Sequence, residues 1–204
     1  SFTSFSQASY LDKNKQEHLW GEIKLSDLQE TPYQDWFTSS YESFQPDLGE
    51  EFPRTNLQDA EVTIFLGTWC GDSKLWVPRF VKLWDELGFD RDQLHFVALH
   101  NKSAVYKQGP DGEEKGLNIH RVPTFIFEQN DQEIARIVES PLNSMEADLA
   151  QISLGFPSTP RYRGASYLST LYAEVPLDSL SQHFRPALRK IYREVHTSSE
   201  LNTF

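Results

Sequence analysis

The stretch EVTIFLGTWCGDSKLWVP, residues 61–78, joins two different patterns and contains the only cysteine of the chain, Cys70. Its first part is a run of aliphatic, β-branched and aromatic residues, which is typical of a buried strand. After Cys70, apolar residues recur at helical spacing up to a stop signal at Gly88. They are Leu75, Val77, Phe80, Val81, Trp84 and Leu87. We therefore expect a strand that leads directly into a helix, with Cys70 at the junction and a kink at Pro78.

Patterns typical of strands and of a further helix continue beyond this helix as far as residue 154. Residues 94–100 form a second apolar run, and residues 124–139 alternate around Asn130 and Asp131, the pattern of a β-hairpin. Residues 141–154 are amphipathic and indicate a closing helix. The order strand, helix, strand, connection, strand, strand, helix predicts the α/β class, with a central mixed sheet flanked by helices.

We expect three parts in the chain: an N-terminal arm and helical addition (1–60), the sheet domain (61–154) and a C-terminal helical extension (155–204). Residues 1–29 are weakly patterned and are expected to be irregular, whereas Thr31 and Pro32 are typical of a helix start. The helix after them carries an aromatic stripe, which we expect to pack on the core rather than to line a ligand groove. This stripe consists of Tyr33, Trp36, Phe37, Tyr41 and Phe44.

Composition excludes several classes of function for this chain of 204 residues. The net charge is −11 and basic residues form no block, which disfavours a nucleic-acid partner. A single cysteine excludes an intramolecular disulfide, and no histidine or carboxylate cluster has metal-ligand spacing, so we expect no metal and no cofactor. No apolar run reaches the roughly 18 residues of a membrane span. The oligomeric state stays open, and so does the choice between a cytoplasmic and an exported or periplasmic location.

Three motifs together resemble the thioredoxin family. They are TWCGDS after a buried strand, a proline eight residues beyond the cysteine, and RVPTFIF at the opening of the hairpin. The tetrapeptide Cys-Gly-Asp-Ser is similar to that of bacterial thioredoxin-like proteins that carry it in place of Cys-Gly-Pro-Cys. The resemblance covers residues 62–154 and implies a thioredoxin-like fold.

The resemblance also implies roles for individual residues. Cys70 would be the nucleophile at a helix N-terminus, where the helix dipole favours a thiolate. Its supporting neighbours would be Trp69, Gly71, Asp72, Ser73 and Arg121.

A second group of residues would bind the substrate. Pro123 would be the cis-proline that faces the cysteine. The backbone at Val122, Pro123 and Thr124 would then bind an extended substrate peptide by strand addition.

The chain departs from the family pattern at the residues that complete the redox cycle. Ser73 occupies the position of the resolving cysteine, and a hydroxyl cannot take part in thiol–disulfide exchange. Ile64 occupies the position of a buried aspartate, and the buried lysine of the following strand is also missing. Arg121, His120 and His100 are candidate substitutes for this acid–base helper. The alternative for Arg121 is a solvated or structural charge, and the alternative for His120 and His100, as for His95, is an ordinary surface residue.

Three function classes remain open on this basis. The first is a monothiol oxidoreductase, in which Cys70 forms mixed disulfides with protein or low-molecular-weight thiols. The second is a redox-silent module that binds peptides or proteins. The third is iron–sulfur cluster binding through Cys70 of two chains, by analogy with monothiol glutaredoxins, although the residues after Cys70 depart from that pattern.

Overall fold

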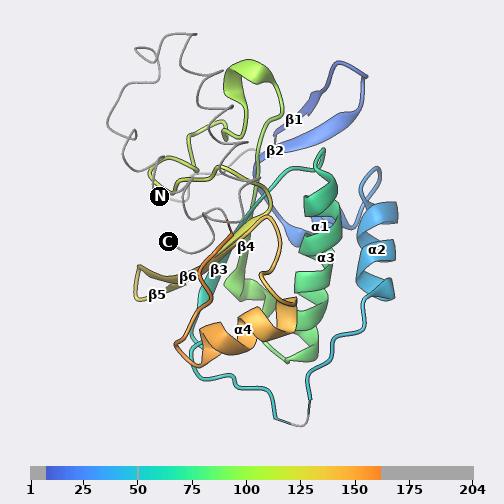
Figure 1. Ribbon diagram of the computed structural model, residues 1–204. Coiled ribbons are helices and arrows are strands. Elements are labelled where there is room, and N and C mark those ends of the chain that lie inside the picture. The colour runs from blue at the N-terminus through green and yellow to red at the C-terminus, as the bar shows by residue number, and fades with distance from the viewer. Residues whose placement is uncertain (1–7, 50, 162–204) are drawn as a thin grey trace, which may run out of the picture.

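The computed structural model describes residues 8–49 and 51–161 (Figure 1). Within these residues the strands form one sheet in the order β1-β2-β4-β3-β5-β6, in which β3 and β4 are parallel and the other neighbours are antiparallel. The strands are β1 (Ala8–Leu11), β2 (Glu17–Ile23), β3 (Glu61–Leu66), β4 (Leu94–Ala98), β5 (Thr124–Gln129) and β6 (Gln132–Val138). The helices are α1 (Leu25–Leu28), α2 (Gln34–Ser43), α3 (Gly71–Glu86) and α4 (Met145–Ser153), with short 3-10 helices η1 (Arg91–Gln93) and η2 (Ser103–Val105). The predicted α/β class, a mixed sheet flanked by helices, is confirmed.

The strand–helix junction at Cys70 forms as the sequence predicts. Cys70 is the N-cap of α3, and the helix continues through Pro78 to Glu86. Gly88 follows in the left-handed region with φ +73°, and the Phe89 N–H donates to the Trp84 carbonyl, which closes the helix end. The hairpin of β5 and β6 turns at Asn130 and Asp131, which both have positive φ.

The larger core lies between the sheet and α2, α3 and α4, which Figure 1 shows on the same side of the sheet. Phe80 and Trp84 of α3 are fully buried there against β5 residues such as Phe125. In the predicted aromatic stripe, Tyr33 and Phe37 are buried. The rest of the stripe, Trp36, Tyr41 and Phe44, is half-buried against the same core. The expectation that this stripe packs on the core is confirmed.

A smaller core covers the opposite face of the sheet. It contains Phe65, Val97, Leu99, Val122 and Ile126, with Trp69, Cys70, Leu117 and Ile119 packed at its border. In the described part of the chain, the connection between β4 and β5 supplies the cover on this side and contains only η2 as a regular element. Cys70 therefore sits where α3 meets the smaller core.

The expectation of an irregular segment at residues 1–29 is wrong, because residues 8–23 form the hairpin of β1 and β2. Asp12 organises its turn: its Oδ1 accepts hydrogen bonds from the N–H groups of Asn14 (2.8 Å) and Gln16 (2.9 Å). β2 also pairs with β4, so this hairpin extends the central sheet.

The start of the predicted aromatic helix is displaced by two residues. Tyr33 is the N-cap of α2, and Thr31 and Pro32 lie in the preceding turn with a cis peptide bond between them. In this turn, the N–H groups of Tyr33 (2.8 Å) and Gln34 (2.9 Å) both donate to the Glu30 carbonyl, so the turn occupies the positions where the sequence predicts the helix start.

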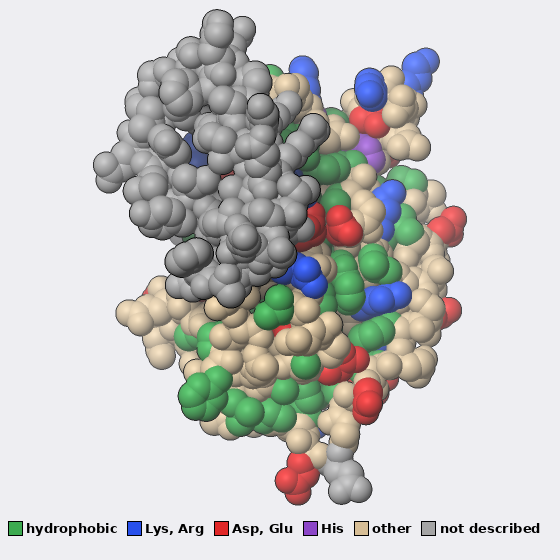
Figure 2. All heavy atoms as spheres, viewed as in Figure 1, with side chains coloured by type: hydrophobic (Ala, Val, Ile, Leu, Met, Phe, Trp, Pro, Cys, Tyr) green, Lys and Arg blue, Asp and Glu red, His purple; other side chains and the backbone are tan. Residues whose placement is uncertain are grey.

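The predicted helices of the C-terminal extension lie outside the described residues. None of the helices that the structure describes is long and apolar enough to cross a membrane. On the face shown in Figure 2, acidic and basic side chains of the described residues are interspersed. On this face, the negative net charge of the chain is thus not gathered in a single acidic block.

Candidate functional site

Cys70 lies beside a segment that is 52 residues away in sequence. Its Sγ donates a hydrogen bond to the Val122 carbonyl (3.2 Å), and the thiol is partly exposed. The Val122–Pro123 peptide bond is cis. The Cys70 N–H donates to the Gly67 carbonyl (2.8 Å), which fixes the loop between β3 and α3. The structure therefore brings together the cysteine and the cis-proline segment that the motifs single out.

Trp69 closes one side of this loop. Its indole Nε1–H donates to the Leu99 carbonyl (2.7 Å), and its ring lies 5.6 Å from the ring of Tyr106. The indole covers Gly67 so closely that a Cβ there would lie 2.6 Å from the Trp69 ring. Gly67 is thus required by the position of Trp69, a role that the sequence did not reveal.

Ser73 and Ile64 are both fully buried, and each contributes to the packing or hydrogen bonding of the fold. Ser73 is fully buried, and its Oγ accepts a hydrogen bond from the Gly67 N–H (3.1 Å). Ile64 is fully buried in β3 between its neighbours Phe96 and Phe125 in the sheet. The position of the family's buried aspartate is therefore part of an apolar core here.

Gly71 and Asp72 form the first residues of α3. A Cβ at Gly71 would meet nothing within 4 Å, so this chain itself makes no close approach that requires glycine there. Burial raises the pKa of the Asp72 carboxyl, the nearby Glu139 raises it further, and Arg121 opposes the shift. Asp72, Arg121 and Glu139 therefore form one group of charges beside the start of α3.

Arg121 does not stand as a lone cation. Its Nη1 forms an ion pair with Glu139 Oε1 at 2.8 Å, and its carbonyl accepts the Thr124 hydroxyl (2.8 Å). Val122, Pro123 and Thr124 are buried. If these three residues bind a substrate, they would therefore contact it through their backbone, as the resemblance implies.

His95 and the two candidate histidines, His100 and His120, have different locations. His95 pairs with Glu61 (2.7 Å) at the start of β4, the opposite end of the parallel β3–β4 pair from Cys70. Burial lowers the pKa of His100, and it lowers that of His120 to about 4. Near neutral pH both rings are uncharged, so neither of them supplies a cation near Cys70.

A half-buried cation does lie near Cys70, and sequence reasoning missed it. Lys107, in the connection between β4 and β5, donates from Nζ to the His120 carbonyl. Burial lowers the pKa of Lys107 to about 8, Arg121 lowers it too, and Cys70 and Glu139 oppose the shift. Only the folded connection places this residue, because Lys107 is 37 positions from Cys70 in a polar stretch.

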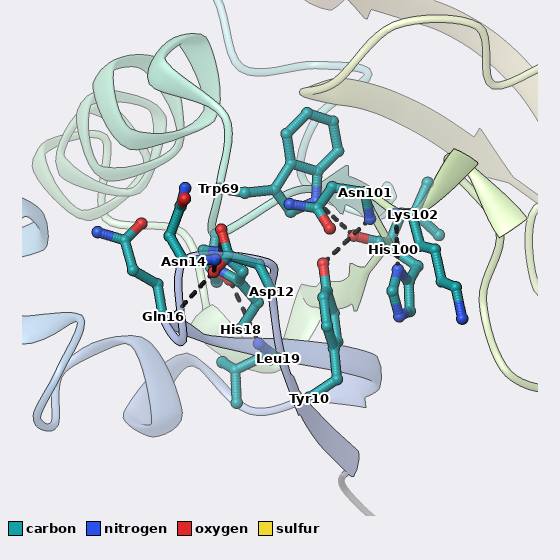
Figure 3. Close-up of polar contacts among 12 residues, drawn as sticks. Tyr10, Asp12, Asn14, Gln16, His18, Leu19, Trp69, His100, Asn101 and Lys102 are labelled. Carbon is teal, nitrogen blue, oxygen red and sulfur yellow. Dashed lines mark hydrogen bonds and ion pairs between the residues drawn. The ribbon is translucent and has the colours of Figure 1, made fainter. Parts of the chain in front are cut away.

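The N-terminal hairpin supports the loop that carries Cys70, as Figure 3 shows for several of its contacts. Thr68 Oγ1 lies 3.2 Å from His18 Nδ1 and accepts the Leu19 N–H (3.3 Å). Two residues beyond the end of β4, the His100 ring stacks on the Tyr10 ring with the ring centroids 3.5 Å apart. β1 and β2 therefore hold the ends of β3 and β4 from the side.

The burial of His120 predicts a pH-dependent stability. Its Nδ1 lies 3.0 Å from the Asn118 carbonyl. Since its pKa falls from the usual 6.5 to about 4, the unfolded chain binds a proton more readily below pH 6.5. Stability is thus full above pH 6.5 and declines as the pH falls toward 4, at about 1.4 kcal/mol per pH unit.

We expect the free energy of unfolding in urea to fall by about 2 kcal/mol between pH 6.5 and pH 5 through His120 alone. His18 and His100 add to the decline in the same direction, because burial lowers their pKa values too. His120→Gln should reduce the slope, and substitution of the exposed His95 serves as the control. An equal slope in wild type and His120→Gln would contradict the assignment.

The described residues contain no group of three or more His, Cys, Asp or Glu side chains that could hold a metal ion. The mixed sheet and its flanking helices, with a cysteine at a helix start beside a cis-proline, define a thioredoxin-like protein as the class that the fold fits.

Two known proteins are similar to part of this chain. A thioredoxin from Malassezia sympodialis is 28% identical over 105 residues, which are 51% of this chain and 92% of that protein. The crystal structure of Chlamydomonas reinhardtii thioredoxin f2 matches 58% of this chain and 94% of its own, at 24% identity and a TM-score of 0.33. No family model matches the chain. The sequence similarity supports a thioredoxin-like relationship for about half of the chain.

Proposed function

We propose that this protein is a monothiol thioredoxin-like protein that exchanges thiols and disulfides through Cys70. The observation that carries the proposal is the position of the thiol. Cys70 is the N-cap of α3, is partly exposed, and bonds to the carbonyl that precedes a cis-proline. A cysteine at a helix N-terminus is favoured as a thiolate, the form that attacks disulfides.

The exchange step forms a mixed disulfide. The Cys70 thiolate attacks one sulfur of a substrate disulfide, a new S–S bond forms to Cys70, and the second substrate sulfur leaves as a thiolate that takes up a proton. The substrate disulfide is thereby reduced at one sulfur. Release of the substrate requires attack by another thiol, and Ser73 supplies only a hydroxyl that is buried against Gly67. An external thiol therefore completes the cycle.

The substrate segment would lie along the backbone at Val122 and Pro123. The side chains of these two residues are buried, so recognition there would rely on the peptide backbone and would accept many sequences. The motif Cys-Gly-Asp-Ser at residues 70–73 supports a place among bacterial thioredoxin-like proteins with this tetrapeptide.

A disulfide-reduction assay on insulin tests the proposal. We expect wild type to reduce little insulin alone and to accelerate the reaction when glutathione is added, because glutathione releases the mixed disulfide. Cys70→Ser should give only the background rate of glutathione itself. If wild type and Cys70→Ser behave alike in the presence of glutathione, the exchange activity is refuted and a redox-silent binding module takes its place.

A further inference from the structure

We propose that Lys107 is a positioning residue that holds a positive charge beside Cys70 and thereby favours its thiolate. The inference rests on the proposed function and adds to it a residue from a part of the chain without any family motif. The thioredoxin resemblance implies a helper in the strands, at Ile64 and in β4, and that helper is missing. The charge here would come instead from the connection between β4 and β5.

The backbone of Lys107 is fixed to the end of β4. Its N–H donates to the His100 carbonyl (2.8 Å), and the His100 N–H donates to the Gln108 carbonyl (3.2 Å). These two bonds close the segment 100–108 into a loop. Lys107 itself has φ +58°, a left-handed conformation that a lysine seldom adopts without such closure. The loop therefore holds the Lys107 side chain in a defined direction.

The side chain ends at the segment that also receives the thiol. Lys107 Nζ donates to the His120 carbonyl, and Cys70 Sγ donates to the Val122 carbonyl two residues later. The ammonium also lies 5.0 Å from the ring centroid of Tyr106, whose ring lies against Trp69. The cation and the thiol thus share one three-residue segment, with Tyr106 and Trp69 beside them.

The pKa of Lys107 depends on the charges around it, and that of Cys70 is among them. Burial and Arg121 favour the neutral amine, whereas Cys70 and Glu139 favour the ammonium, and the pKa is lowered to about 8. Asp72 belongs to the same group of charges through Arg121 and Glu139. The neighbouring His120 stays neutral. Because the Lys107–Cys70 coupling is reciprocal, an ammonium that is favoured by the thiolate favours that thiolate equally.

Arg121 is less suited to this role. Its guanidinium forms an ion pair with Glu139, which offsets its charge, and arginine stays protonated throughout the working pH range. The Lys107 ammonium instead loses its proton as the pH rises through about 8. The positive charge that favours the thiolate is therefore present below that pH and is lost above it.

Alkylation of Cys70 with iodoacetamide, a neutral reagent, tests the inference over pH 5–9. We expect Lys107→Met to slow alkylation at pH 7 by about three- to tenfold and to shift the pH profile upward, because an opposite charge is lost. Lys107→Arg keeps a charge and should restore most of the rate. Lys102→Met, which removes an exposed lysine of the same loop, is the matched control and should match wild type.

The titration of Lys107 itself gives the reciprocal measurement. We expect its side-chain NMR signal to titrate at lower pH in Cys70→Ser than in wild type, because the thiolate that favours the ammonium is gone. This readout does not depend on any exchange activity. An equal Lys107 titration in both proteins, or a Lys107→Met pH profile equal to that of wild type, would overturn the inference. If Cys70 and Lys107 are coupled in this way but wild type reduces insulin no faster than Cys70→Ser in the presence of glutathione, the proposed function alone is refuted.

Discussion

Replacing Ser73 with cysteine is expected to raise the rate of insulin reduction by about tenfold or more when a dithiol reductant is supplied. The new thiol would lie three residues from Cys70 in the first turn of α3. It could attack the mixed disulfide from within the chain, which makes the release step intramolecular and forms a disulfide between residues 70 and 73. A dithiol reductant would then restore both thiols.

The hydrogen bond of Ser73 determines how much stability this substitution loses and which variant is its control. The buried Ser73 Oγ accepts a hydrogen bond from the Gly67 N–H, and a cysteine sulfur is a weaker acceptor. We expect a loss of about 1 kcal/mol in the free energy of unfolding. Ser73→Ala removes the same hydrogen bond without adding a thiol. If Ser73→Cys turned over no faster than Ser73→Ala, internal resolution at this position would be excluded.

Replacing Gly67 with alanine is expected to destabilise the protein by about 2–3 kcal/mol, the cost of inserting a methyl group into a packed site. The added Cβ would lie 2.6 Å from the Trp69 indole, so the ring must move. Its hydrogen bond to the Leu99 carbonyl and its contact with Tyr106 would then be weakened. Since Trp69 and Cys70 border the same small core, we also expect faster alkylation of Cys70.

Gly71→Ala is the matched control for that substitution. A Cβ at Gly71 would meet nothing within 4 Å, and alanine is favoured over glycine at the start of a helix. Urea unfolding should therefore show Gly71→Ala to be as stable as wild type or slightly more so. Near-equal stability of Gly67→Ala and wild type, with unchanged Trp69 fluorescence, would contradict the packing described at Gly67.

Local sequence patterns predict the centre of this fold well. The apolar run of β3, the helix that starts after Cys70 and the turn at Asn130 and Asp131 are each specified within a few residues. Local patterns do not predict the hairpin of β1 and β2, because β1 has only four residues and β2 includes charged residues and Gly21. Its stability comes instead from β4, which pairs with β2 and is 70 to 80 residues away.

In the site, too, some residues are predicted by local sequence patterns and others are placed only by contacts between distant parts of the chain. The motifs TWCGDS and RVPTFIF predict that Cys70 lies near Val122 and Pro123. Lys107 is placed by hydrogen bonds that close the loop 100–108 and by burial, which no local pattern encodes. The histidines were candidates by type alone, and burial of His100 and His120 keeps their rings neutral.

Intact-mass spectrometry of a trapped adduct is the direct test of nucleophilic exchange at Cys70. Reduced wild type is incubated at pH 7 with a peptide disulfide and quenched with acid, and a portion is then treated with excess thiol. Exchange at Cys70 should give one adduct per chain, located on Cys70, absent in Cys70→Ser and reversed by the added thiol. A folded wild type that gains no adduct under conditions in which free cysteine does would contradict it.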